Sequence, residues 1–323
     1  MPTEIWNDLD TIITTTTYRK LSQKSVLIIA YDEQDLIEFQ TYLNDNVKFQ
    51  SKNFIIKGFI KEKYLWPRIF NHNYGYRYGH RNEGRHSRFQ LVSQLTTILQ
   101  GVDIVVSMIG SNYEHQKIII QCCVEAQIPR FIAWEFGVNL QSPILNYDMS
   151  ALEGHELDEE LDNTPKRFKY TLLQTGYLSN EILSSQMGFH LQDKMMTIYG
   201  KGIEPLNLTF KQDLMRLLCN MICNDDRHEL FRKKIVIGKR TSQLQIYEEI
   251  KKVTKVEFKI VRYGLQDIPY DQQFQRLLAV GRLKAFVGRN TEVRRYFPDF
   301  EPMDISKWIE TQSDLSKSYH IIP

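Results

Sequence analysis

The sequence lacks any long hydrophobic run, has few cysteines and carries no excess of either charge. No apolar stretch approaches the roughly 20 residues that cross a bilayer, and residues 1–10 lack the pattern of a signal or transit peptide. The 41 lysines and arginines nearly balance the 39 aspartates and glutamates, so no global field favours nucleic acid or an anionic membrane. We expect a globular protein of the cytosol or nucleus, without membrane or nucleic-acid partners.

Cysteine is scarce, and its spacing suggests no bound metal. Four cysteines in 323 residues do not make a disulfide framework. Cys122 and Cys123 are adjacent and would point about 100° apart on a helix, whereas Cys219 and Cys223 would share one helix face. The sequence supplies no neighbouring His or Cys ligands for a metal. We therefore predict four small core residues and no metal site.

Strand-like and helix-like patterns alternate along the first half of the chain. Residues 1–24 show no clear period and are predicted to be a surface leader. Short apolar runs then alternate with segments in which apolar residues recur at helical spacing. The runs are 26–29, 54–60, 104–109, 130–133 and 170–174, and the helical segments are 36–43, 91–99 and 118–126. This alternation predicts an α/β protein with a Rossmann-type doubly wound parallel sheet, with residues 25–176 as the dinucleotide-binding domain.

The alternation loosens after Gly176, which predicts a smaller C-terminal substrate domain over residues 177–323. Its expected elements are a short segment at 195–199, a strand at 234–237 and helices at about 211–223, 243–254 and 305–311. Residues 256–260 alternate apolar and polar side chains, a pattern typical of a half-exposed strand.

Glycine is missing where a dinucleotide-binding fold needs it most. Ligands of such sheets lie outside the carboxyl ends of the strands, which directs attention to residues 30–36, 107–113 and 133–139. The first of these segments contains no glycine, although a pyrophosphate must approach the backbone there. Asp32, Glu33 and Asp35 would repel phosphates by roughly 1 to 4 kcal/mol each at about 4 Å. The alternative is that these acids favour the helix N-terminus.

The other two strand ends carry the candidate cofactor-binding residues. One segment, from Ser107 to Asn112, ends a strand and opens a helix, so its amides and hydroxyls are placed to contact a ligand. In the other, a carboxylate lies between two aromatic rings, which suits a stacked ring ligand, although packing between domains explains the pattern equally well. The candidate residues are Ser107, Met108, Ile109, Gly110, Trp134, Glu135 and Phe136.

These segments carry a resemblance to a known family. Residues 101–110, the helix ending at 126–132 and Trp134-Glu135-Phe136-Gly137-Val138-Asn139 resemble the NmrA and isoflavone-reductase group of atypical short-chain dehydrogenases. The tryptophan before the acid and the Phe-Gly-Val after it are most similar to the fungal isoflavone-reductase-like branch. Residues 171–177, 199–213 and 237–241 follow the order of the family's C-terminal half.

The resemblance implies a Rossmann domain that binds NADP(H) and a smaller domain that closes over a hydrophobic substrate. Reductases of the family resemble one another in using a helix lysine as general acid or base. The matching residues 152–161 contain no lysine, and His155 is the nearby replacement with a suitable proton affinity. The alternative places His155 on a solvated helix face.

Residues 61–88 form a basic and aromatic insertion. Seven lysines and arginines alternate with aromatic residues: Lys61, Lys63, Arg68, Arg77, Arg81, Arg85 and Arg88 with Tyr64, Trp66, Tyr74, Tyr76 and Tyr78. The resemblance implies that one arginine contacts an adenosine 2′-phosphate. A nucleic-acid or phosphoprotein contact is a second interpretation, and a flexible solvated insertion is the interpretation we favour.

Two functions follow from these observations. The first is an NAD(P)H-dependent reductase acting on a small carbonyl or enone compound. The second is a catalytically degenerate NmrA-like regulatory or redox-sensing protein that acts through a protein partner, which the missing glycines and lysine favour.

Overall fold

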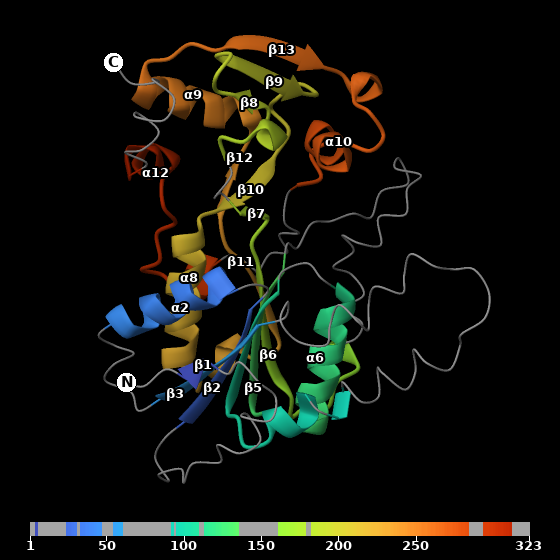
Figure 1. Ribbon diagram of the computed structural model, residues 1–323, viewed down its shortest axis with the longest axis vertical. Coiled ribbons are helices and arrows are strands. Elements are labelled where there is room, and N and C mark those ends of the chain that lie inside the picture. The colour runs from blue at the N-terminus through green and yellow to red at the C-terminus, as the bar shows by residue number, and fades with distance from the viewer. Residues whose placement is uncertain are drawn as a thin grey trace, which may run out of the picture. The chain divides into compact units, whose positions relative to one another are not determined.

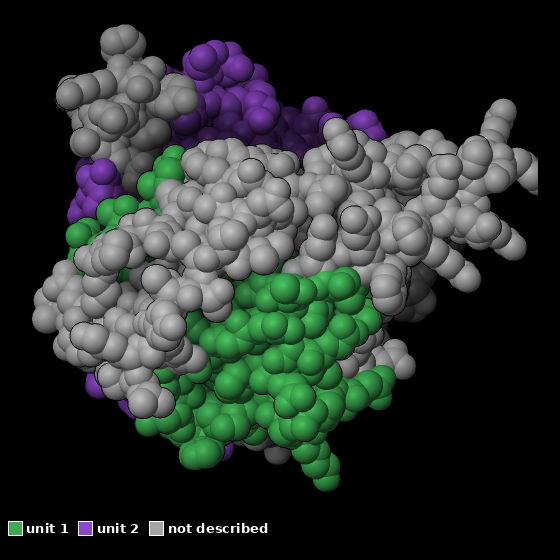
Figure 2. Space-filling view, turned by 60° about the horizontal axis from the view of Figure 1, so that its bottom comes forward, with its two compact units in different colours: residues 1–135, 150–173, 215–234 green, residues 136–149, 174–214, 235–323 purple. Residues whose placement is uncertain are grey.

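The computed structural model describes ten stretches of chain that form two compact units. They are residues 4–5, 24–30, 33–46, 54–60, 92–93, 95–109, 113–135, 161–178, 182–283 and 293–311 (Figure 1). Unit 1 comprises residues 1–135, 150–173 and 215–234, and unit 2 comprises residues 136–149, 174–214 and 235–323 (Figure 2). Residues 215–234, assigned to the smaller domain from the sequence, therefore belong to unit 1.

A seven-stranded sheet has the strand order of a doubly wound fold, β1-β3-β2-β4-β5-β6-β11. Its strands are β1 (Glu4–Ile5), β2 (Lys24–Ala30), β3 (Phe54–Ile60), β4 (Ile104–Met108), β5 (Arg130–Glu135), β6 (Lys169–Gln174) and β11 (Lys233–Val236). The pairs from β1 through β5 are parallel. The predicted α/β class with a Rossmann-type parallel sheet is confirmed.

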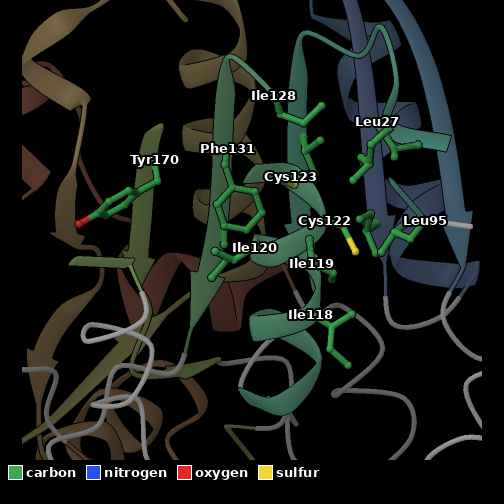
Figure 3. Packing of buried hydrophobic residues seen from close by; sticks show 14 of the residues in the cluster. Leu27, Leu95, Ile118, Ile119, Ile120, Cys122, Cys123, Ile128, Phe131 and Tyr170 are labelled. Carbon is green, nitrogen blue, oxygen red and sulfur yellow. The ribbon is translucent and has the colours of Figure 1, made fainter. Parts of the chain in front are cut away.

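Continuous apolar runs form the central strands because both faces of the sheet are covered. Every residue of β4 is buried, as are residues 25–30 of β2. Leu27, Val105 and Phe131 pack with the apolar stripe of α6 (Tyr113–Glu125) in one cluster (Figure 3). The helix α2 (Glu33–Asp45) lies on the other side of the sheet and buries Leu36 and Phe39.

All four cysteines are free thiols buried in helices of the fold. Cys122 and Cys123 lie in α6, and Cys219 and Cys223 lie in α8 (Lys211–Cys223). Burial raises the pKa of Cys122 to about 12 and that of Cys123 well above its ordinary value. Their predicted role as small core residues is confirmed.

The N-terminal residues contribute a short edge strand that the sequence does not predict. Glu4 and Ile5 pair in parallel with Lys57 and Gly58 of β3. A strand of two residues is too short to show a period, so pattern analysis assigns it to the leader.

Unit 2 contains two small sheets with helices. One has the order β12-β10-β7 and the other β13-β9-β8. The strands are β7 (Tyr177–Leu178), β8 (Phe189–His190), β9 (Met195–Tyr199), β10 (Leu206–Thr209), β12 (Lys239–Thr241) and β13 (Lys259–Tyr263), and the helices are α9 (Gln243–Thr254), α10 (Gln273–Ala279), α11 (Val293–Tyr296) and α12 (Ile305–Thr311). The predicted bounds of β9, α8, α9 and α12 are confirmed.

The predicted strand at 256–260 is shifted toward the C-terminus, because β13 begins at Lys259. Lys255 ends α9 in the left-handed region, at φ 58°. Phe258 then turns inward, and its ring makes edge-on contacts with Phe189 and Tyr247. The alternation of apolar and polar residues at 256–260 therefore has two causes, the burial of Phe258 before the strand and the start of β13 itself.

Candidate functional site

The order of strands in the large sheet reverses between β2 and β4. The chain passes from β2 to β3 on one side and then returns to β4 on the other. The carboxyl ends of β2 and β4 are aligned, with Ala30 opposite Met108, and Ser107 lies opposite Ala133 of β5. Such a reversal point is where open parallel sheets bind ligands. The candidate site therefore lies at the carboxyl ends of β2, β4 and β5, within unit 1.

Ser107 is part of a buried polar chain at this point. Its hydroxyl donates to Gln116 Oε1 at 2.8 Å, and Gln116 Nε2 donates to the Trp134 carbonyl oxygen at 3.4 Å. Ser107 is fully buried, and Gln116 is 1% exposed. One side chain of α6 thus connects the ends of β4 and β5, and the Ser107 hydroxyl is directed into the fold.

Met108 and Ile109 complete the described part of the β4 end. Both side chains are buried, because β4 is covered on both faces. Contact of these two residues with a cofactor remains a prediction. Gly110, Phe136, His155 and the insertion at 61–88 lie outside the described residues.

Trp134 carries an unsatisfied donor near the end of β5. The residue is half-buried, yet its indole Nε1 has no solvent access and no hydrogen-bond partner among the residues that the structure describes. A buried N–H without an acceptor is costly, and a bound ligand is one way to supply that acceptor. Glu135, which ends β5, is buried. Its role in binding remains a prediction, as does that of Trp134.

The connection from β2 to α2 is short and free of glycine. The strand ends at Ala30 and the helix begins at Glu33, with Tyr31 and Asp32 between them. A pyrophosphate loop needs glycines so that backbone amides reach the phosphates. The first turn of α2 also contains Asp35, which adds a second carboxylate after Glu33.

Two residues of α6 that the sequence patterns do not single out lie beside this site. His115 and Gln116 are both buried in the first turn of the helix. His115 precedes Ile119 by four residues, so helical spacing would have placed it on the buried stripe.

The described residues contain no group of three or more His, Cys, Asp or Glu side chains arranged to hold a metal. None of the helices in the described ranges is long and apolar enough to cross a membrane.

Comparison with known proteins shows the fold but not the family. No protein-family model matches the sequence, and no curated protein matches it. A structure from a study of pinoresinol-lariciresinol and phenylcoumaran benzylic ether reductases, and their relationship to isoflavone reductases, is similar with a TM-score of 0.61 at 14% identity. The match covers 90% of this chain and 99% of that one.

Two further structures hold nucleotides. AtPrR2 with NADP+ and (+)-pinoresinol has a TM-score of 0.60 at 13% identity, covering 90% of this chain and 98% of that one. The UDP-glucuronic acid 4-epimerase of Bacillus cereus, with UDP-glucuronic acid and NAD, has a TM-score of 0.55 at 15% identity, covering 91% and 99%. At these identities the likeness concerns the fold, which reductases and an epimerase share.

The two ends of the site fit a dinucleotide differently. Near the end of β5, the unsatisfied Nε1 of Trp134 is a donor suited to a polar ring ligand. At the start of α2, the residues present do not fit a pyrophosphate in its usual position, because the turn has no glycine and carries carboxylates.

Proposed function

We propose that this protein is an NAD(P)H-dependent reductase of the isoflavone-reductase-like type, acting on a small carbonyl or enone compound. The observation that carries the proposal is the similarity over nearly the whole chain to reductase structures, one of which holds NADP+ and (+)-pinoresinol. The resemblance at residues 101–139 supports the same class, and its fungal branch remains a prediction.

In this proposal the cofactor binds at the carboxyl ends of β4 and β5. The backbone of residues 107–110 contacts it from one strand end, and Trp134, Glu135 and Phe136 surround its ring from the other. His155 is the proposed proton donor to the substrate, in place of the lysine that residues 152–161 lack. NADP(H) is the proposed form.

Cofactor titration tests the proposal directly. We expect NADPH or NADH to bind in calorimetry, and Trp134→Phe, which keeps a ring but removes the N–H, to weaken binding about tenfold. Trp308→Phe is the matched control, because Trp308 packs against Phe210 in unit 2. Absence of binding at millimolar concentrations of either cofactor would refute the reductase proposal.

A degenerate regulator of the same fold is the second candidate. The short glycine-free connection between β2 and α2 favours it, as does the absence of lysine from residues 152–161. Such a protein would act through a protein partner, in the cytosol or nucleus.

Turnover separates the two candidates. Steady NADPH oxidation with a panel of quinones and enones supports the reductase and excludes the regulator. Capture of a defined partner without turnover supports the regulator.

A further inference from the structure

The strand β13 in unit 2 has an exposed outer edge. Within the described part of the chain it pairs only with β9, in parallel, from Lys259 opposite Met195 to Tyr263 opposite Tyr199. Lys259, Ile260, Arg262 and Tyr263 are exposed, whereas β9 is buried except at its first residue. Figure 1 shows β13 on the outside of this small sheet.

The backbone N–H and C=O groups of two residues of β13 point away from β9. The Lys259 N–H donates to the Lys194 carbonyl at 2.8 Å, and the Tyr263 carbonyl accepts from the Gly200 N–H at 2.9 Å. Because backbone groups alternate in direction along a strand, Val261 shares this orientation, and the donors and acceptors of Ile260 and Arg262 point outward. These two residues present hydrogen-bonding groups for a further strand.

The charged side chains of β13 itself are basic. Two carboxylates lie near its C-terminal end, where Glu204 accepts from the Lys201 N–H at 3.0 Å and Asp267 accepts from the Gly264 N–H at 2.9 Å. Lys259 and Arg262 lie on the strand. Lys194 lies beside the strand, because its carbonyl accepts from the Lys259 N–H. Lys201 also lies beside it, because its carbonyl accepts from Arg262 Nη1 at 2.9 Å. The nearby carboxylate of Glu257 is paired with Lys251 at 2.7 Å. A negatively charged strand would therefore find opposite charge here.

We propose that the outer edge of β13 binds an extended acidic segment of a partner protein, which adds to the β13-β9-β8 sheet as a fourth strand. Exposed sheet edges bind extended peptides through backbone hydrogen bonds, with side chains giving specificity. A second copy of this chain is disfavoured as the occupant, because two β13 edges would bring Lys259 and Arg262 of both copies together. Ile260 and Tyr263, which are 39% and 41% exposed, supply apolar contact.

The test uses the full chain and a synthetic peptide that alternates Glu and Val, with a Lys and Val peptide as the charge control. Fluorescence anisotropy is expected to detect the acidic peptide and not the basic one. Ile260→Pro removes an outward N–H while leaving the β9 hydrogen bonds in place, which edge strands tolerate. It is expected to weaken binding about tenfold, whereas Ile260→Val, which keeps both the N–H and an apolar side chain, retains it.

Charge reversal provides a second variant that does not depend on proline. Lys259→Glu with Arg262→Glu is expected to lose the acidic peptide and gain the basic one. The proposal is overturned if the acidic peptide fails to bind at millimolar concentration, or if Ile260→Pro binds it as tightly as the parent. Dimerisation of the free chain that Ile260→Pro abolishes would also overturn it, since a second copy would then occupy the edge. Because β13 lies in unit 2, these results do not depend on cofactor binding in unit 1.

Discussion

At the residue scale, Gln116 connects two strand ends of the candidate site. It accepts from Ser107 and donates to the Trp134 carbonyl, so its amide joins two strand ends that would otherwise meet only through the sheet. A satisfied buried network of this kind fixes positions, and its members become costly once a partner is removed.

We predict that Gln116→Leu lowers the free energy of unfolding by about 1 to 3 kcal/mol, because the buried Ser107 hydroxyl loses its acceptor. The double variant with Ser107→Ala should recover part of this loss, since both partners are then apolar. Urea unfolding measures both values. Equal stability of Gln116→Leu and the parent would contradict the network.

At the scale of an element, α12 depends on the side chain that precedes it. Asp304 accepts from the Ser306 N–H at 3.0 Å and forms an ion pair with Lys239 at 2.8 Å. The hydrogen bond from Lys239 is the main cause that lowers the pKa of Asp304 below its ordinary 3.8. Asp304 thus caps the helix and ties it to β12.

We predict that Asp304→Ala destabilises the protein by about 1 kcal/mol, the usual cost of a lost N-cap. The pH dependence follows from the lowered pKa: the stabilisation is present above 3.8 and is lost as pH falls through the folded value. In acid titration of unfolding, Lys239→Met should therefore lose stability less steeply than the parent below that pH. An unchanged slope would refute the coupling.

The start of α2 gives a prediction about the cofactor. If phosphates approach this turn, Glu33→Gln with Asp35→Asn should tighten NADPH binding, because two repulsive carboxylates are removed. The same change should cost a few tenths of a kcal/mol in stability through the helix dipole. Calorimetric titration of both proteins measures the affinity. Glu38→Gln, further along the same helix, is the control, and an equal gain there would indicate a general charge effect.

Elements buried on both faces were predictable from sequence, whereas exposed ones were less so. The central strands β2 and β4 are continuous apolar runs because residues 25–30 of β2 and every residue of β4 are buried. The exposed strand β13 lacks that constraint, and its predicted position was shifted. The helix α9 was predicted with correct bounds. The structure adds its N-cap, in which the Ser242 hydroxyl oxygen accepts from the Gln245 N–H.

The candidate site was predictable in position but not in orientation. Strand ends located Ser107 and Trp134 in the sequence, because ligands of parallel sheets collect there. The contact between Ser107 and Gln116 depends on the packing of α6 against β4, which no local pattern of residues encodes. The unsatisfied N–H of Trp134 likewise emerges only from its surroundings.

At the scale of the whole molecule, neither unit is one continuous stretch of chain, because segments of the two units alternate along the sequence. Residues 215–234 return to unit 1, where Asp225 pairs with Lys24 at 2.7 Å and the Leu230 carbonyl accepts from Thr171. Arg130, 2% exposed, donates to the same threonine hydroxyl at 2.6 Å and lies over the Phe231 ring.

We predict that a fragment ending at residue 176 fails to unfold cooperatively, because it leaves Thr171 and the buried guanidinium of Arg130 without their partners from 225–231. Thermal circular dichroism of the fragment and of the full chain makes the comparison. Restoration of a cooperative transition by adding residues 177–238 would support the explanation, and a cooperative transition in the short fragment would refute it.

The reactivity of the buried cysteines can be used to measure local opening of the fold. All four thiols lie in unit 1, and the raised pKa values of Cys122 and Cys123 keep them protonated and unreactive while they stay covered. Alkylation of Cys122 and Cys123 in native buffer therefore proceeds at the rate or equilibrium of local opening in unit 1. A ligand at the ends of β4 and β5 should slow the labelling, whereas a peptide on β13 should leave its kinetics unchanged, so one mass-spectrometric time course distinguishes occupancy of the two surfaces.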